Sequence, residues 1–231
     1  EDMTAEMSLP TTPNNLYATA TWVDLNNDGW TDLVADGRVW INQEGHSFVQ
    51  GQALGKVVAA DFDNDGWTDL YSYSTGRLFR NAQGTLVENT SFPKITNPHF
   101  SLGATWGDFN NDGWVDLYVS GYENYVDNIT FPDYLFINSG GQSFTRSVIT
   151  STYRARGVTA CDFDQDGDLD IYVSNYRLQP NILWQNNGSG NFSDVAWLFN
   201  ARAGNGHSIG SSWGDFDNDG LFDLFAGNFA H

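Results

Sequence analysis

Short apolar runs separated by turn residues recur along the 231-residue chain, and they predict β-strands. One unit of this pattern has an apolar run at 57–60, an alternating run at 70–73, the segment RLFRN at 77–81 and a fourth run at 85–88. Turns containing glycine separate the last three runs, as antiparallel hairpins require. Because helical periodicity is absent, the pattern predicts an all-β fold built from four-stranded units.

The third predicted strand of this unit has counterparts elsewhere in the chain. RVWIN at 38–42, YLFIN at 134–138 and ILWQN at 182–186 match RLFRN, and each ends in Asn. A glycine follows each segment within a few residues, which predicts a hairpin turn into a fourth strand. The recurrence indicates an internal structural repeat.

Aspartate-rich segments of nine residues lie between the first two predicted strands of each unit. They follow the pattern Asp, any, Asp or Asn, any, Asp, Gly, any, any, Asp, and together they hold 19 of the 29 acidic residues. Their first aspartates are 37, 47, 54 and 53 residues apart, a period typical of propeller blades. We call them acidic loops one to five, and they span residues 24–32, 61–69, 108–116, 162–170 and 215–223.

The spacing of oxygens in each acidic loop suits a hard cation. Calcium takes about six to eight oxygen ligands, which side chains at positions 1, 3, 5 and 9 and a backbone carbonyl at position 7 can supply. Glycine at position 6 permits the tight turn. An alternative is that these are Asx-turns that only stabilise the loops, but several adjacent carboxylates would then repel one another. An EF-hand is disfavoured because no amphipathic helices flank the loops.

The acidic loops therefore predict up to five bound Ca²⁺ ions. The predicted ligands are Asp24, Asn26, Asp28, Trp30 and Asp32 in loop one; Asp61, Asp63, Asp65, Trp67 and Asp69 in loop two; Asp108, Asn110, Asp112, Trp114 and Asp116 in loop three; Asp162, Asp164, Asp166, Asp168 and Asp170 in loop four; and Asp215, Asp217, Asp219, Leu221 and Asp223 in loop five.

The segments that lead into the loops, such as LGATWGDF at 102–109 and IGSSWGDF at 209–216, resemble the FG-GAP/VCBS repeat. The resemblance covers the chain from about residue 17 onward. This repeat builds the β-propellers of integrin α subunits and of cartilage acidic protein-like proteins, and those of several lectins and lyases. The resemblance implies a calcium ion between the first two strands of each blade and an extracellular location, but it implies no single activity.

The number of repeats predicts an incomplete propeller. Blades are expected to start near residues 17, 56, 102, 156 and 209, which makes four complete blades and a fifth with two strands. Residues 3–9 resemble the end of a fourth strand. We expect the 231 residues to be one propeller region, a fragment of a longer chain that forms a seven-bladed ring, or one that another chain completes. The alternative is a five-bladed ring in which residues 1–16 supply the missing strands.

Loops at the opposite end of the blades vary in length and collect basic and aromatic residues, which predicts a ligand face for a protein or glycan. The alternative is that its arginines pair with nearby acids and lie over the rim. The predicted ligand-face residues are Tyr122, Tyr125, Tyr153, Arg154, Arg156, Tyr176, Arg177, Arg202 and His207.

Composition and motifs argue against several classes of function. A formal net charge of −19 argues against nucleic-acid binding, and no apolar run is long enough to span a membrane. No nucleophile elbow, HExxH motif or Cys–His pairing is present, so we expect a secreted or cell-surface adhesion or matrix scaffold rather than an enzyme. The alternatives are a lectin and a polysaccharide lyase that uses Tyr153, His207 and Arg202. Sequons at Asn89, Asn128, Asn187 and Asn191 fit a glycoprotein.

Overall fold

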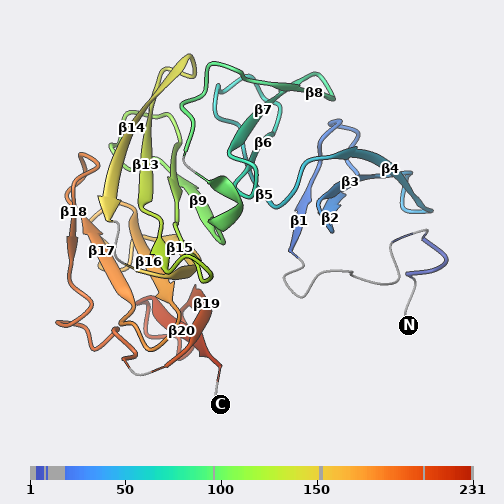
Figure 1. Cartoon of the computed structure of the whole chain (residues 1–231). Helices are drawn as coiled ribbons and strands as arrows, with labels where there is room; N and C mark the ends of the chain where they lie inside the picture. Colours follow the sequence, from blue (N-terminus) through green and yellow to red (C-terminus); the bar gives the residue numbers. More distant parts are fainter. Residues whose placement is uncertain are drawn as a thin grey trace. The chain divides into compact units, whose positions relative to one another are not determined.

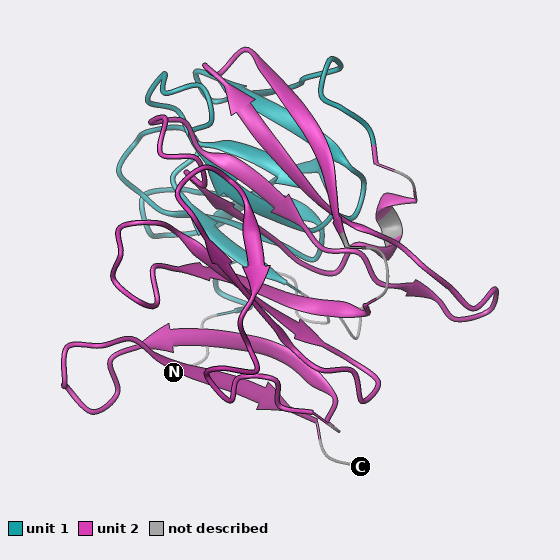
Figure 2. Cartoon of the chain, turned by 90° about the vertical axis from the view of Figure 1, so that its left-hand side faces the viewer, with its two compact units in different colours: residues 1–94 teal, residues 95–231 magenta. Residues whose placement is uncertain are grey.

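The computed structural model describes residues 4–7, 9, 19–95, 97–150, 153–204 and 206–229. The chain divides into two compact units, unit 1 at residues 1–94 and unit 2 at residues 95–231 (Figure 2). Each unit is built from antiparallel sheets in which strands that follow one another in sequence are neighbours in space.

Unit 1 contains two four-stranded sheets, which we call blades one and two (Figure 1). Both sheets have their strands in chain order, so every connection is a hairpin. Buried side chains from both blades form one apolar core cluster that includes Leu25, Val39, Leu70 and Phe79. The strands are β1 (Ala20–Val23), β2 (Asp32–Ala35), β3 (Arg38–Asn42) and β4 (Phe48–Ala53) in blade one, and β5 (Val57–Ala60), β6 (Asp69–Ser72), β7 (Arg77–Ala82) and β8 (Thr85–Glu88) in blade two.

Unit 2 contains two more four-stranded sheets, blades three and four, and the two-stranded blade five. A short hairpin, β11 (Glu123–Asn124) and β12 (Ile129–Thr130), interrupts blade three, and the 3-10 helix η1 (Pro98–Phe100) precedes it. The strands are β9 (Ala104–Gly107), β10 (Asp116–Val119), β13 (Asp133–Ser139) and β14 (Ser143–Thr150) in blade three, β15 (Ala155–Cys161), β16 (Asp170–Asn175), β17 (Ile182–Asn186) and β18 (Phe192–Asp194) in blade four, and β19 (Ser208–Gly214) and β20 (Asp223–Asn228) in blade five.

The second strand of a complete blade is the most buried one. Strands β6, β10 and β16 are buried at every residue, because both faces of the strand are covered. The first strands of neighbouring blades in unit 2 also approach closely. A Cβ at Gly157 of β15 would lie 2.7 Å from the carbonyl oxygen of Ile209 in β19, so only glycine fits there. This close approach places the starts of β15 and β19 side by side.

The predicted fold class is confirmed. The described residues are almost entirely strand and turn, and they form four complete four-stranded antiparallel blades and a two-stranded fifth. Residues 4–7 form a turn, in which the N–H of Leu9 donates to the carbonyl of Thr4, so the strand expected over 3–9 is wrong for these residues. Of the rest of segment 1–16, only residue 9 lies within the described residues. The seven-bladed ring stays a prediction.

The blade topology separates two ends of each sheet. Each acidic loop connects the first strand of a blade to the second, whereas the connection from the second strand to the third lies at the other end. In blade four, for example, Cys161 pairs with Asp170 at the acidic-loop end, and Ala155 pairs with Asn175 at the opposite end. The two groups of candidate site residues therefore lie at opposite ends of the blades. Within the described residues, no helix is long and apolar enough to cross a membrane.

Candidate metal centres

The five acidic loops share one backbone conformation. The glycine at position 6 has a φ between 85° and 96° in every loop, and the residue at position 4 (Asn27, Asn64, Asn111, Gln165 or Asn218) also has a positive φ. Asn and Gly adopt this left-handed region most readily, which explains both positions of the motif. The resulting turn brings the carboxylates at positions 1 and 5 back to backbone N–H groups of the same loop.

Carboxylates at positions 1 and 5 hold this turn in place. The position 1 carboxylate accepts the N–H of the glycine at position 6, at 2.8–3.1 Å in the five loops. The position 5 carboxylate accepts the N–H of position 7, at 2.8–3.0 Å. The N–H of position 7 thus helps to hold the loop. That the carbonyl of this residue binds a cation stays a prediction for Trp30, Trp67, Trp114, Asp168 and Leu221.

The aspartate at position 9 links each loop to its blade. One of its oxygens accepts the N–H of position 2, at 2.9–3.2 Å. In the four complete blades the other oxygen accepts the N–H of the Asn that ends the third strand, at 2.7–2.8 Å. Sequence reasoning identified these asparagines only as turn residues. They are Asn42, Asn81, Asn138 and Asn186.

Burial makes these position 9 carboxylates costly to ionise. Desolvation raises the pKa of Asp69 and the pKa of Asp170 to about 7. It raises the pKa of Asp116 to about 6, and it also raises the pKa of Asp32. The two backbone hydrogen bonds oppose this effect, and the neighbouring carboxylates of each loop add to it. A cation in the loop would favour the ionised form of all of these groups.

In three loops the carboxylates converge closely enough to share one ion. Oxygen atoms of the aspartates at positions 1, 3 and 9 lie within 4.8 Å of one another in loops two, four and five. Position 3 is an amide in loops one and three, where Asn26 and Asn110 donate to the position 5 carboxylate at 2.8 and 2.9 Å. The clusters are Asp61, Asp63 and Asp69; Asp162, Asp164 and Asp170; and Asp215, Asp217 and Asp223.

Two buried oxygens in these loops also indicate a place for a cation. Oδ1 of Asp24 and Oδ1 of Asp63 are buried and make no hydrogen bond within the part of the chain that the structure describes. A buried carboxylate oxygen without a donor is unfavourable unless a cation satisfies it. The donor set, carboxylate and amide oxygens without sulfur or imidazole, fits a hard divalent cation such as Ca²⁺.

Loop two differs from the others because it already contains a positive charge. Arg80 of β7 contacts Asp63 through Nε and Asp65 through Nη2, the second contact being 2.7 Å long. A polar cavity of about 330 Å³ lies beside this contact, lined by Arg80, Asp65 and Trp67 among others. In loop four the corresponding position of the third strand is Gln185, which donates to Asp164 at 2.6 Å. Sequence reasoning did not anticipate the role of Arg80.

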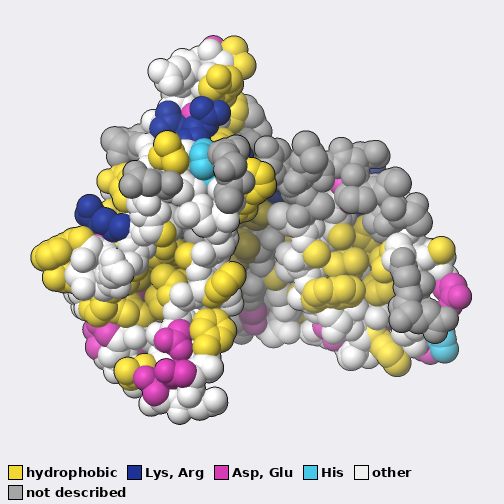
Figure 3. Space-filling model, turned by 90° about the horizontal axis from the view of Figure 1, so that it is seen from below, with side chains coloured by type: hydrophobic (Ala, Val, Ile, Leu, Met, Phe, Trp, Pro, Cys, Tyr) yellow, Lys and Arg dark blue, Asp and Glu magenta, His cyan; other side chains and the backbone are white. Residues whose placement is uncertain are grey.

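Most of the predicted ligand-face residues come together in unit 2, around a buried carboxylate that sequence reasoning missed. Glu123, whose side chain is 2% exposed, pairs with Arg154 at 2.5 Å and with Arg177 at 2.6 Å. Figure 3 shows basic side chains, a histidine and hydrophobic side chains gathered on one face. We call this group the Glu123 cluster, and it comprises Tyr122, Glu123, Tyr125, Arg154, Arg156, Tyr176, Arg177 and His207.

Two predicted ligand-face residues lie elsewhere. Tyr153 is partly buried and packs against the apolar core cluster of blades three and four. Arg202 pairs with Asp194 at 3.5 Å. The alternative that arginines of this face pair with nearby acids is therefore confirmed for Arg154, Arg177 and Arg202. The position of Glu123 between two tyrosines, in GYENY, was the signal that could have identified it.

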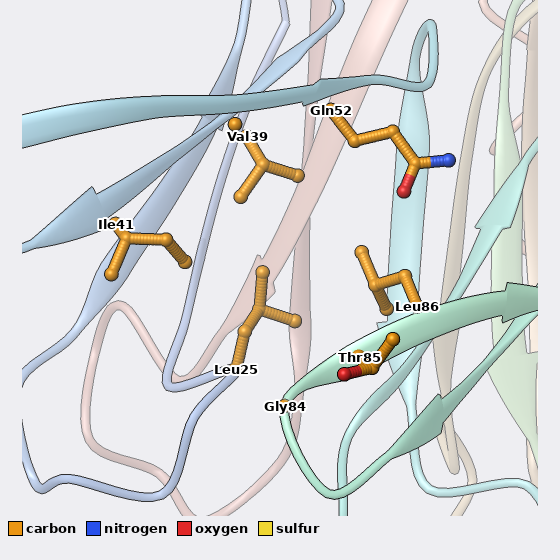
Figure 4. A pocket seen from close by; sticks show the side chains of 8 residues that line it. Leu25, Val39, Ile41, Gln52, Gly84, Thr85 and Leu86 are labelled. Atoms are coloured by element: carbon orange, nitrogen blue, oxygen red, sulfur yellow. The ribbon is translucent and has the colours of Figure 1, made fainter.

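A separate cavity of about 260 Å³ in unit 1 lacks the chemistry of a site. Leu25, Val39, Ile41 and Leu86 line it, together with Gln52 and Thr85 (Figure 4). Leu25 and Val39 belong to the core cluster of this unit, and none of the lining residues is charged. The cavity is therefore interpreted as a gap in the packing between blades one and two.

The sequence of this chain matches a known repeat family and two known proteins. The FG-GAP-like repeat family matches residues 61–119, 127–173 and 162–226. Cartilage acidic protein 1 of Xenopus tropicalis is 30% identical over 115 residues, and that of Mus musculus is 27% identical over 114 residues. Each alignment covers 46% of this chain and 17% of the relative, so the chain spans a small part of the length of these proteins.

Two solved structures share the fold. A lectin from Agrocybe aegerita, described as recognising non-reducing terminal N-acetylglucosamine, matches with a TM-score of 0.57 and 16% identity, over 91% of this chain and 60% of that one. The V. cholerae biofilm matrix protein Bap1 matches with a TM-score of 0.51 and 19% identity, over 92% of this chain and 35% of that one. At these identities the likeness concerns the fold alone.

Proposed function

This chain belongs to the FG-GAP-like repeat family, and from that premise we propose that it is a calcium-binding extracellular β-propeller that acts as an adhesion or matrix-interaction scaffold. The observation that carries the proposal is the convergence of three carboxylates in each of loops two, four and five. Because such groups repel one another, and because Asp69 and Asp170 are also buried, a bound cation would turn an unfavourable cluster into a stabilising one.

The acidic loops give the calcium a structural role. Residues at positions 1, 3, 5 and 9 would hold the ion, which supplies positive charge that compensates the buried carboxylates. Position 9 also bonds to the third strand, so the ion would stabilise the whole blade rather than the loop alone. Five ions would change the formal charge of the chain from −19 to about −9.

The names of the relatives and the affinity range of extracellular calcium modules support the extracellular location. The two relatives are named for cartilage, and one structural neighbour is described as a biofilm matrix protein. Extracellular calcium modules operate with dissociation constants of about 10⁻⁴–10⁻³ M, a range in which short loops of this kind can be saturated outside cells. A propeller with rigid blades and variable loops is suited to presenting an interaction surface.

Thermal unfolding in calcium and in excess chelator tests this proposal. Saturation of one site at 100 times its dissociation constant is worth about 2.7 kcal/mol. In a protein of this size that corresponds to a melting temperature higher by roughly 5–10 °C per site. We expect a large decrease in chelator, full recovery with Ca²⁺ and partial recovery with Mg²⁺, which prefers smaller octahedral sites. An unchanged melting curve in chelator would contradict the proposal.

A carbohydrate-binding role is the second candidate, and the exposed tyrosine of the Glu123 cluster favours it. Tyr125 is 70% exposed and lies beside Arg177, an arrangement suited to a ligand with an apolar face and polar groups. A glycan array distinguishes a lectin from a scaffold for protein partners.

We propose that the chain has no catalytic role. The three residues expected of a lyase occur in three environments: Tyr153 packs on the core, Arg202 pairs with Asp194, and His207 contacts Tyr176. Formation of unsaturated uronates, followed by absorbance, would overturn this.

A further inference from the structure

The Glu123 cluster carries a positive charge in a strongly acidic chain. The guanidinium groups of Arg154 and Arg177 pair with one carboxylate, Glu123, and that of Arg156 lies over the rings of Tyr122 and Tyr176. The four charged side chains of the cluster have a net charge of +2. The whole chain has a formal net charge of −19. The only other acid of the same hairpin is Asp127, which accepts a hydrogen bond from Asn124. A local positive field on an acidic protein selects anionic groups for binding.

The cluster is held rigidly by three segments of unit 2. Glu123 lies on β11, Arg154 directly precedes β15, and Arg177 follows β16. The carbonyl of Arg154 accepts the N–H of Tyr176 at 2.9 Å, and the N–H of Ala155 donates to Gly121 at 3.1 Å. Both ion pairs with Glu123 use the Nε atom of the arginine, so the Nη groups do not take part in them. Glu123 therefore positions two guanidinium groups through their Nε atoms, and the side chain of Tyr122 also bonds to that of Arg177.

Aromatic rings orient the remaining guanidinium. Arg156 of β15 lies 3.8 Å from the ring centre of Tyr176 and 5.1 Å from that of Tyr122. The ring of His207, at the start of blade five, contacts the edge of Tyr176 with ring centres 4.5 Å apart. Stacking of this kind fixes the plane of the guanidinium and lowers the entropy cost of binding a planar or tetrahedral anion.

An exposed rim adjoins the charged centre. Tyr125 is 70% exposed and lies under the guanidinium of Arg177 at 4.4 Å, and Leu178 is 57% exposed. Arg177 and Leu178 both have a positive φ, of 56° and 61°. Successive left-handed residues other than glycine cost energy, and such strain persists where the surrounding structure imposes it, often at ligand sites. The strained turn keeps an apolar side chain and a charged one at the surface.

We propose that the Glu123 cluster binds an acidic saccharide, with Arg156 and Arg177 receiving its carboxylate or sulfate and Tyr125 stacking on a sugar ring. The proposal names the ligand of the interaction scaffold described above and rests on that function. Arginine matches the planar carboxylate and the sulfate by paired hydrogen bonds. The exposed ring favours a saccharide over an acidic peptide, because a sugar ring offers an apolar face to stack on.

Binding of defined polysaccharides by the full chain in calcium-containing buffer tests the proposal. The probes are heparin, which carries sulfates and carboxylates, hyaluronan, which carries carboxylates only, neutral dextran, and poly-glutamate as an acidic peptide. Two variants probe the cluster: Arg177→Gln keeps Arg154 as the partner of Glu123, and Tyr125→Ala alters an exposed ring. Arg202→Ala is the matched control, an exposed arginine of the same unit that pairs with Asp194.

We expect the unaltered protein to bind heparin, hyaluronan or both, and not dextran. Arg177→Gln should weaken this binding at least tenfold and Tyr125→Ala severalfold, whereas Arg202→Ala should change it less than twofold. Equal effects of Arg177→Gln and Arg202→Ala, binding of dextran, or tighter binding of poly-glutamate would overturn the proposal. Which of the two acidic polysaccharides binds tells sulfate from carboxylate recognition.

Melting curves of the same samples separate this proposal from the scaffold function. Loss of binding in a variant whose melting temperature still depends on calcium as in the unaltered protein supports the Glu123 cluster as the site. If the unaltered protein binds none of the acidic polysaccharides while calcium still stabilises it, the ligand proposal fails alone. If calcium has no effect on stability, the proposed calcium-dependent function fails, whatever the polysaccharides do.

Discussion

Asn186 of blade four donates a hydrogen bond through its side-chain Nδ2 to the carbonyl of Phe109 in acidic loop three, at 2.8 Å. The same amide bonds to Leu169, and the backbone N–H of Asn186 bonds to Asp170. In unit 1, Asn81 makes the equivalent bond to the carbonyl of Leu25, at 2.7 Å. In blades two and four, the Asn that ends the third strand thus joins its own acidic loop to the acidic loop of the preceding blade. A cation bound in such a loop would therefore act on two blades.

Replacing this residue should destabilise the protein strongly. Asn186→Ala removes two hydrogen bonds that the side-chain amide donates, one of them fully buried, and leaves the carbonyl oxygens of Phe109 and Leu169 without this donor. It also removes the bond that Oδ1 accepts from the N–H of Asn187. We expect a loss of about 2–4 kcal/mol in the free energy of unfolding, measured by urea titration. Asn191→Ala is the control, because Asn191 is exposed on the same hairpin and its amide makes one long bond of 3.3 Å. Similar losses for the two variants would contradict the bridging role of Asn186.

Arg80 should weaken the affinity of loop two for calcium. Its guanidinium contacts Asp63 and Asp65, so the ion must displace or approach a like charge. We expect Arg80→Gln, which copies Gln185 of loop four, to raise the calcium affinity of loop two severalfold, since a like charge at the surface costs on the order of 1 kcal/mol. Calcium titration by calorimetry measures the change. Arg77→Gln on the same strand, where Arg77 pairs with Glu88, should leave the titration unaltered.

The amide at position 3 should make loops one and three weaker calcium sites than loops four and five. Asn26 and Asn110 replace a carboxylate with an amide oxygen, which is a poorer ligand for Ca²⁺. Asn110→Asp should therefore raise the calcium affinity of loop three and raise the melting temperature at low calcium. In chelator the added charge should instead lower the melting temperature, because nothing compensates it. A higher melting temperature in chelator would show that charge repulsion does not govern this loop.

Asp133 should make stability depend on pH independently of the acidic loops. It is completely buried in blade three, and desolvation raises its pKa to about 7, against hydrogen bonds from Tyr118 and Gly121 that lower it. Because the folded state holds this proton and the unfolded state releases it near pH 4, stability should decrease as the pH rises from about 4 to 7. The slope from one such group is at most about 1.4 kcal/mol per pH unit.

Comparison of Asp133→Asn with the unaltered protein isolates this contribution. The variant cannot titrate at this position, so its stability should fall less steeply between pH 5 and 7, as measured by urea unfolding at each pH. Above pH 7 both proteins should show similar slopes. Parallel curves from pH 5 to 7 would show that Asp133 keeps a constant protonation state in this range.

The sequence predicts those parts of the fold and of the metal centres that depend on the spacing of residues close together in the chain. The strands of blade two begin and end within a residue or two of the predicted runs, because alternation and turn residues are local properties of the chain. The acidic loops are equally local, since nine consecutive residues contain the left-handed positions and the carboxylates that converge. Residues 4–7 lack such a pattern, and there the predicted strand was wrong.

By itself, then, the sequence determined the all-β blades, the acidic loops and the carboxylate groups in them that could hold a metal ion, because each depends on residues a few positions apart. Only the tertiary structure decided that Arg80 enters loop two, that Asn186 reaches Phe109, and that Glu123 pairs with Arg154 and Arg177. Arg80 and Asp63 are 17 residues apart in the sequence, Asn186 and Phe109 are 77 apart, and Arg154 and Glu123 are 31 apart. Their meeting depends on how strands pair and blades pack, and no local pattern encodes that geometry.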